Sequence, residues 1–200
     1  RYMHLGTGNY NPFTSKIYTD LGLLTSNHEI GEDATHVFNY LTGYSNKREF
    51  NHLLVAPVSL RSGLETLIER EIEHARRGRP SGMIFKVNSV ADQKVITKLY
   101  EASKAGVRQD LIVRGICCLK PGVEGVSEKI KVRSIIGRFL EHSRIYYFEN
   151  GGKPEIYCGS ADLMERNLSR RVEILFPLID QEIRDHLKQN LDLMLSDNTL

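Results

Sequence analysis

Hydrophobic residues in the middle of the chain follow two patterns, short continuous runs and stripes at helical spacing. The runs at 53–56, 83–87 and 110–114 are typical of buried strands. Two stripes between them predict helices that end near Gly78 and Gly106. The stripes consist of Leu64, Leu67, Ile68 and Ile72, and of Val95, Ile96, Leu99 and Ala102. This alternation predicts an α/β fold with a mixed, largely parallel sheet and helices on both of its faces.

Shorter elements are predicted before this central region. Residues 2–5 and 16–24 read as strands separated by a turn-rich loop. A helix follows and ends at Gly43, with an apolar stripe formed by Ala34, Val37, Phe38 and Leu41. Residues 44–51 have no periodicity, so we expect a linker there and two domains, at 1–46 and 47–200.

Further strands and a last helix are predicted after the central region. A long loop at 116–129 is of the kind that often carries function. Four strands are expected, near 130–136, 144–148, 155–159 and 171–176. The last helix starts at Asp180, and its stripe predicts core packing by Ile183, Leu187, Leu191 and Met194.

The composition is ordinary for a globular protein, with 40% hydrophobic and 26% charged residues. No apolar run approaches the roughly 18 residues of a membrane helix, and no signal peptide is visible. Cys117 and Cys118 are adjacent and Cys158 stands apart, which excludes metal-type spacing and indicates a reducing cytoplasm. The net charge of +2 is too small to predict nucleic-acid binding. Because the chain starts at Arg1 rather than Met, we expect a fragment.

Two short motifs recur at an offset of 153 residues. The first is Gly-Thr-Gly-Asn at 6–9 followed by Asp20, and the second is Gly-Ser-Ala-Asp at 159–162 followed by Glu173. Glycine lets the backbone approach an anion closely, hydroxyl groups such as that of Ser160 supply hydrogen bonds, and a strand carboxylate can orient a histidine from behind. Each motif alone is as consistent with a plain turn, but the shared spacing favours a pair of phosphate sites.

His142 is the strongest candidate for a catalytic residue. Arg144 stands two residues later, so on a strand both side chains lie on one face. Imidazole can act as a nucleophile or a general acid, and the cation can neutralise phosphate oxygens. A structural histidine is the alternative. His4 has no lysine or arginine two residues beyond, and we interpret it as structural.

Other arginines are candidates for phosphate binding. Arg114 closes an apolar strand, at the sheet edge where α/β proteins bind ligands. Its alternative is a buried salt bridge. Arg166, Arg170 and Arg171 form a basic cluster after the Gly-Ser turn. We expect some of them to face a ligand and at least one to pair with Glu165 or Glu173.

Several longer stretches resemble the polyphosphate kinase family over nearly the whole chain. They are YMHLGTGNYNP (2–12), YTDLGLLT (18–25), FNYLTG (38–43), LIVRGIC (111–117), FLEH (139–142), YFENGG (147–152), GSAD (159–162) and RRVE (170–173). The paired motifs also look like the tandem half-sites of the phospholipase D superfamily. The resemblance implies a phospholipase D-like fold, with 1–46 the end of a first catalytic domain and 47–200 a complete second one.

The resemblance also implies a reaction. ATP gives its γ-phosphate to a histidine, which passes it to polyphosphate; ADP is the other product. Tyr18 matches a nucleotide-binding tyrosine, Arg114 an arginine that binds ATP phosphates, and His142 a second active-site histidine that contacts ATP. The phosphorylated histidine and most ligands of the required Mg²⁺ would lie upstream, so we expect no metal site in this chain and no catalysis by it alone. A homo-oligomer in the cytoplasm is implied too, with a peripheral position at the inner membrane as the alternative location.

Two departures and two alternatives remain. Arg144 stands where the superfamily usually has lysine, and Asp162 where it usually has asparagine. A phospholipase D-like phosphodiesterase is one alternative, although it needs two complete half-sites. The other is a non-catalytic module that binds nucleotide or polyphosphate.

Overall fold

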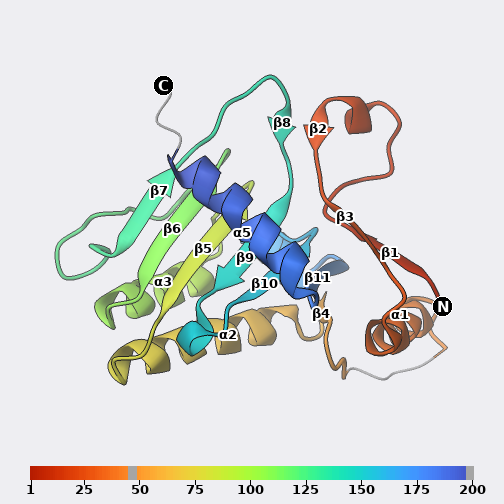
Figure 1. Ribbon diagram of the computed structural model, residues 1–200, viewed down its shortest axis with the longest axis horizontal. Helices are drawn as coiled ribbons and strands as arrows, with labels where there is room; N and C mark the ends of the chain where they lie inside the picture. Colours follow the sequence, from red (N-terminus) through yellow and green to blue (C-terminus); the bar gives the residue numbers. More distant parts are fainter. Residues whose placement is uncertain (45–48, 197–200) are drawn as a thin grey trace.

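The computed structural model describes residues 1–44 and 49–196. Within these residues, seven strands form the main sheet in the order β4-β11-β10-β9-β5-β6-β7 (Figure 1). Their bounds are β4 Leu54–Ala56, β5 Gly82–Val87, β6 Arg108–Val113, β7 Ile130–Arg133, β9 Arg144–Phe148, β10 Glu155–Gly159 and β11 Glu173–Pro177. β5, β6 and β7 pair in parallel, whereas the other neighbouring strands pair antiparallel.

The mixed α/β fold is therefore confirmed, with fewer parallel pairs than the sequence suggests. β9 and β11 run against the other strands of this sheet, so parallel hydrogen bonding is confined to β5, β6 and β7. One reason is the short connection between β9 and β10, which contains only the single turn η2 (Asn150–Gly152) and residues beside it. A connection this short joins antiparallel strands, because parallel neighbours need a longer crossover.

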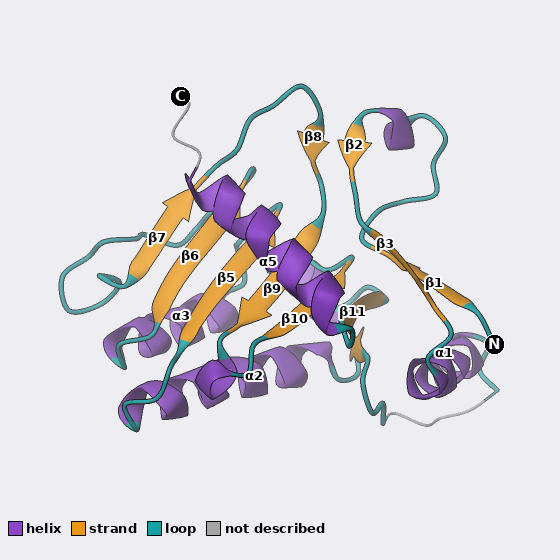
Figure 2. Ribbon diagram, viewed as in Figure 1, coloured by secondary structure: helices purple, strands orange, loops and turns teal. Residues whose placement is uncertain are grey.

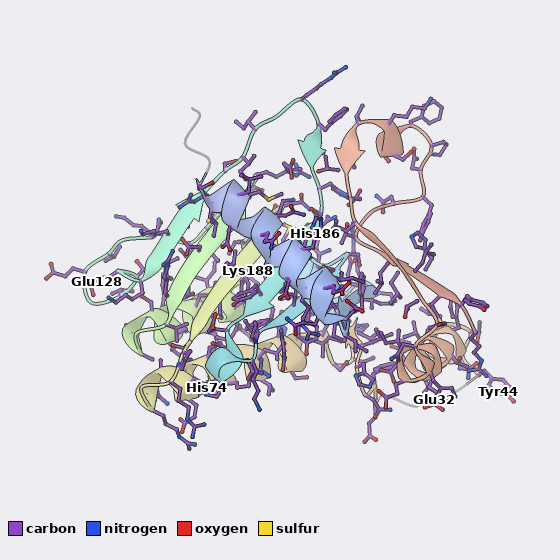
Figure 3. All side chains as sticks on the ribbon, viewed as in Figure 1. Glu32, Tyr44, His74, Glu128, His186 and Lys188 are labelled. Carbon is purple, nitrogen blue, oxygen red and sulfur yellow. The ribbon has the colours of Figure 1, made fainter. Side chains whose placement is uncertain are left out.

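Helices cover both faces of the sheet (Figure 2). α2 (Leu60–Arg76) and α3 (Gln93–Lys104) bury one core against it. α5 (Gln181–Ser196) and α1 (His28–Leu41) contribute to a second core on the opposite face. On that face lies Lys188 of α5 (Figure 3). Its ammonium is 5.2 Å from the centre of the Tyr147 ring. No helix within the described ranges combines the length and apolarity needed to cross a bilayer.

Side chains of β5 alternate between these two cores. Met83, Phe85 and Val87 belong to the core under α2 and α3, and Ile84 belongs to the core under α5. Because successive strand residues point to opposite faces, Lys86 lies on the same side as Ile84. A lysine is thus placed in the interior on the α5 side of the sheet.

The N-terminal segment differs from its prediction. The expected strand at 16–24 is wrong as one element, because the structure has the turn η1 (Thr14–Lys16) and two short strands, β2 (Tyr18–Thr19) and β3 (Gly22–Thr25). β3 pairs antiparallel with β1 (Met3–Gly6), and β2 pairs in parallel with β8 (Leu140–Glu141), a short strand that the sequence did not predict. β2 and β3 are separate strands because they pair with different neighbours, β8 and β1. Asp20 lies between them.

The stripe predicted for α1 is partly wrong. Val37 is buried, but Phe38 and Leu41 are 68% and 50% exposed. The side that faces inward is fixed by Asp33, whose buried carboxylate accepts hydrogen bonds from the backbone N–H groups of residues 51–53. A buried acid that binds main chain has no signature in hydrophobic spacing. The predicted linker at 44–51 lies partly outside the described residues.

The C-terminal predictions also need small corrections. The expected strand at 171–176 starts at Glu173, because a short helix, α4 (Glu165–Ser169), precedes it. In α5, Leu187 and Leu191 are buried as expected, whereas Ile183 is 43% exposed.

The repeat seen in the sequence is also a repeat of structure. β1 pairs with β3 in the same register as β10 pairs with β11, at the offset of 153 residues. The matching pairs are Leu5↔Leu23 with Cys158↔Phe176, and Gly6↔Gly22 with Gly159↔Leu175. α1 falls on α5 at the same offset. The hydroxyls match as well: Thr7 Oγ1 accepts from Leu21 N at 2.9 Å, and Ser160 Oγ accepts from Ile174 N at 3.3 Å.

Candidate functional site

His142 lies where the two copies of the repeat meet. It follows β8 and precedes β9, and its backbone N–H and that of Ser143 both donate to the Thr19 carbonyl, at 3.2 and 3.0 Å. The His142 side chain is 8% exposed. A residue from the second half of the chain is therefore held by backbone contacts to the first half.

The carboxylate of Asp20 contacts the imidazole of His142. Both oxygens lie 3.0 Å from Nδ1, and the Thr7 hydroxyl donates to Oδ1 at 2.8 Å. A Cβ at Gly8 would lie 2.1 Å from Asp20 Oδ2, so only glycine fits at this position. Because a carboxylate only accepts, the contact favours the tautomer with the proton on Nδ1 and a lone pair on Nε2.

Arg144 is buried beneath the imidazole and is bound to protein groups. Its Nη1 donates to the carbonyls of Thr7 and His142 at 3.1 and 3.0 Å, while Nε and Nη2 donate to the two oxygens of Asp162. Nη1 also lies 3.0 Å from Nε2 and 3.3 Å from Nδ1 of His142. If Arg144 Nη1 lay in the plane of the imidazole at these distances from both nitrogens, it would overlap Cε1, the carbon between them. Nη1 therefore lies over one face of the ring. The in-plane lone pair of Nε2 is left available.

A chain of hydrogen bonds connects this pair to Arg114. Asp162 accepts from the backbone N–H of Asn88 at 2.7 Å, and Asn88 Oδ1 accepts from Arg114 Nε at 2.5 Å. Asn88 and Arg114 each follow the end of a parallel strand, β5 and β6, at one edge of the sheet. The adjacent Gly115 has no room for a Cβ, which would lie 2.7 Å from the Asn88 carbonyl oxygen. Arg114 and His142 thus belong to one cluster.

Open space borders the cluster beside Tyr18 and beside Arg114. The Tyr18 ring lies 4.6 Å from the His142 ring, centroid to centroid, at an interplanar angle of 43°. A hollow of about 300 Å³ is lined by Tyr18 and Asp20 among others, and one of about 440 Å³ by Arg114 and Glu141 among others. Among the described residues, the Arg114 side chain makes one hydrogen bond, from Nε. Its two terminal nitrogens are therefore available to a bound anion.

Burial and the Arg144 guanidinium lower the pKa of the His142 imidazole below 6.5, and the hydrogen bond to Asp20 opposes this shift. We expect an NMR titration of the imidazole signals to give a midpoint below pH 6.5. Asp20→Asn should move it lower still, since the opposing charge is removed. A midpoint at or above the ordinary value would contradict this environment.

The lowered pKa has a consequence for stability. As the pH falls below about 6.5, the unfolded chain binds this proton before the folded one does. The free energy of unfolding should therefore decrease with falling pH in the window below 6.5. His142→Gln, which cannot titrate, should lose this component in pH-dependent urea denaturation.

Four predicted site residues lie apart from His142. Ser160 is bonded to the backbone of Ile174, and Glu173 accepts from Asn167 Nδ2 at 2.6 Å. Arg166 and Arg170 are exposed on and after α4, and Arg170 pairs with Glu165 at 3.2 Å. The Gly-Ser turn reaches the cluster through Asp162 instead of Ser160. Arg171 is also exposed.

Sequence reasoning did not select Asn88, Lys86 or Glu141. Asn88 follows its strand at the same sheet edge as Arg114 does, which is a usable signal. Lys86 interrupts an otherwise apolar run, and it contacts Glu141 at 3.1 Å. These contacts join residues far apart in the sequence, so no local pattern reveals them.

The residues present do not form a metal site. The carboxylate of Asp20 is bound by His142 and Thr7, and that of Asp162 by Arg144 and Asn88. Within the described ranges, no group of three His, Cys, Asp or Glu side chains is placed to hold a metal ion.

Two family models match the sequence. Residues 1–47 match the model "Polyphosphate kinase C-terminal domain 1", and residues 53–200 match "Polyphosphate kinase C-terminal domain 2". A polyphosphate kinase of Thermosynechococcus vestitus is 58% identical over 198 residues, which cover 99% of this chain and 27% of the relative. One of Bacillus cereus is 53% identical, covering 99% and 28%. The chain thus spans about 28% of the length of such relatives.

Solved structures agree in fold. The crystal structure of polyphosphate kinase from Porphyromonas gingivalis matches with a TM-score of 0.95 and 44% identity, over 98% of this chain and 30% of that one. The phospholipase D family member Nuc from Salmonella typhimurium matches with a TM-score of 0.52 and 11% identity, over 70% of this chain and 90% of that one. The second likeness concerns the fold alone, and it agrees with a phospholipase D-like architecture.

Proposed function

Because this chain belongs to the polyphosphate kinase family, we propose that it supplies the second half-site of an enzyme that moves the γ-phosphate of ATP reversibly to polyphosphate. The cluster of His142, Asp20, Arg144 and Arg114 is the observation that carries the proposal. Phosphate transfer depends mainly on positioning and on neutralising oxygen charges. The cluster offers an uncommitted imidazole nitrogen beside a guanidinium with free donors.

Each residue of the cluster has a separate role in this proposal. His142 Nε2 exchanges a proton with a phosphate oxygen of ATP or of the leaving ADP, as acid or base. Arg114 holds phosphate oxygens through two parallel hydrogen bonds, and Tyr18 lies against the nucleotide. Asp20 orients the imidazole. The Arg144 guanidinium donates hydrogen bonds to Asp162 and to the carbonyls of Thr7 and His142. We therefore assign it a positioning role, in place of the phosphate-binding role that its spacing from His142 suggests.

The phosphorylated histidine belongs to the first half-site, outside this chain. At the offset of 153 residues, Glu173 is the counterpart of Asp20. Glu173 is buried on β11 and does not contact His142, which Asp20 already serves. We therefore assign Glu173 to the histidine of the first half-site. In the same proposal, residues 1–46 end the first phospholipase D-like domain and 47–200 form the second, the required Mg²⁺ is held by groups outside this chain, and the enzyme is a homo-oligomer in the cytoplasm.

A chimera tests the function directly. This chain replaces the matching segment of the Thermosynechococcus vestitus enzyme, with which it is 58% identical. We expect the chimera to make polyphosphate from ATP and to form an acid-labile phosphoprotein with γ-labelled ATP, whereas the 200-residue chain alone does neither. A folded but inactive chimera would refute the proposal. Release of nitrophenol from bis-nitrophenyl phosphate would favour a phosphodiesterase instead.

Arg114→Ala in the chimera should lower kcat/KM by about 100-fold, the usual cost of one charge-stabilising donor. Arg108→Ala is the matched control, because Arg108 begins the strand that Arg114 follows and its side chain is 73% exposed. The control should stay within about two-fold of the chimera, since Arg108 lies at the opposite end of β6 from Arg114. Equal kcat/KM values for the two variants would show that Arg114 does not bind substrate.

A further inference from the structure

Lys86 is a buried lysine whose ammonium is fully occupied by protein groups. The residue is 2% exposed. Its Nζ contacts the Ser143 carbonyl at 3.1 Å, the Ser143 hydroxyl at 2.7 Å and a Glu141 carboxylate oxygen at 3.1 Å. An ammonium has three protons to donate, and three acceptors lie in reach. Lys86 therefore has no donor left for a phosphate.

The partners of Lys86 are the residues immediately before and after His142. Adjacent residues of an extended segment point to opposite sides, so Lys86 holds this segment from the side away from the imidazole. The charges of Asp20 and Arg144, which contact the imidazole, also act on the Lys86 ammonium. Lys86 thus touches neither Nδ1 nor Nε2, and it acts on His142 only through the segment that carries it.

The contacts of Lys86 lie where the backbone pairing of the segment changes from β9 with β5 to β8 with β2. The ladder between β5 and β9 ends at the pair Lys86↔Ile145. The residues that precede β9 pair with β2 instead of β5, and Leu140 N donates to the Ile17 carbonyl at 2.8 Å. Between the two ladders, the Lys86 side chain connects β5 to Glu141 and Ser143, while Asn88 Nδ2 bonds the His142 carbonyl at 3.4 Å.

Resting on the proposed function, we infer that Lys86 is a positioning residue, which holds the His142 imidazole in register between Asp20 and the substrate by clamping Glu141 and Ser143. Without the clamp, the segment keeps its bonds to β2 and the bonds to the His142 carbonyl, but Glu141 and Ser143 lose their contacts with β5. The imidazole then spends less time in the reactive position. We expect a smaller effect on substrate binding than on kcat, because neither Arg114 nor Tyr18 contacts Lys86, although Glu141 also lines the hollow beside Arg114.

Lys86→Met in the chimera tests this inference. We expect kcat to fall by about 10–100-fold, the usual range when a supporting residue is removed, with KM for ATP within about two-fold. Lys98→Met is the control, since Lys98 forms a surface ion pair on α3, and it should leave both constants unchanged. An increase in KM with kcat retained would identify Lys86 as a ligand clamp and overturn the inference. An inactive unsubstituted chimera would instead refute the proposed function.

A double-mutant comparison separates positioning from general destabilisation. In a His142→Ala background, Lys86→Met should lower kcat no further, because its effect passes through the imidazole. Multiplying effects would contradict the inference. If Lys86→Met does not fold, Ser143→Ala removes the shortest contact with little change in volume. It should lower kcat by about three- to ten-fold, again only when His142 is present. An unchanged kcat would contradict the positioning role of Lys86.

Discussion

Replacing His142 with alanine should lower kcat of the chimera by about 10²–10⁴-fold, the range attributed to a positioned acid or base. The Asp20 contact and the ring-face position of Arg144 leave Nε2 as the group that can exchange a proton with substrate. Because Arg114 still binds phosphate oxygens, KM for ATP should change much less than kcat. Initial rates of polyphosphate synthesis across ATP concentrations measure both constants.

His28→Ala is a suitable control, because its side chain is 85% exposed at the start of α1. That variant should be indistinguishable from the unsubstituted chimera. Retention of more than about a tenth of kcat in His142→Ala would show that the proton transfer has another agent.

Replacing Arg144 with methionine should cost about 3–5 kcal/mol of unfolding free energy, the usual effect of breaking a buried ion pair. Asp162 would keep a buried carboxylate without its partner, and the carbonyls of Thr7 and His142 would lose their donor. Urea denaturation of the 200-residue chain measures this loss. In the chimera, we expect kcat to fall as well, since the support of the ring face is gone.

A second substitution separates the cost of leaving the Asp162 carboxylate unpaired from the loss of the other Arg144 contacts. Arg144→Met with Asp162→Asn leaves no unpaired charge, so most of the stability should return while kcat stays low. Arg170→Met removes an exposed pair with Glu165 and should cost under about 1 kcal/mol. If Arg144→Met were as mild as this surface control, the buried network would not stabilise the fold.

Local pattern predicts most of the fold, because burial is periodic in helices and strands. The runs at 83–87 and 110–114 become neighbouring parallel strands, and the parallel ends place Asn88 and Arg114 together. The failures occur where polar groups decide the structure. The expected strand at 16–24 breaks where Thr19 and Leu21 bond to different partners, and the outward turn of Phe38 follows from the buried Asp33.

The candidate site is less predictable, because it depends on contacts between distant segments. The repeat at an offset of 153 residues selects Asp20 and Glu173 as candidate orienting acids, but the sequence does not say which histidine each acid contacts. In the structure, His142 contacts the acid of the other copy, 122 residues away. The same applies to Arg144, whose spacing from His142 suggests a ligand-facing cation but whose donors are used by Asp162 and two carbonyls.

The contact of His142 with the acid of the other copy has an evolutionary consequence. A protein with one copy could form such a pair only by lending its acid to an identical chain and receiving one in return, as in a two-fold symmetric dimer. In that ancestor every substitution would appear twice. Joining the copies in one gene releases them from this constraint, and here one copy has threonine and aspartate where the other has serine and glutamate. Under the proposed function, fusion would allow the two halves to specialise, one to carry a phosphate and the other to assist its transfer.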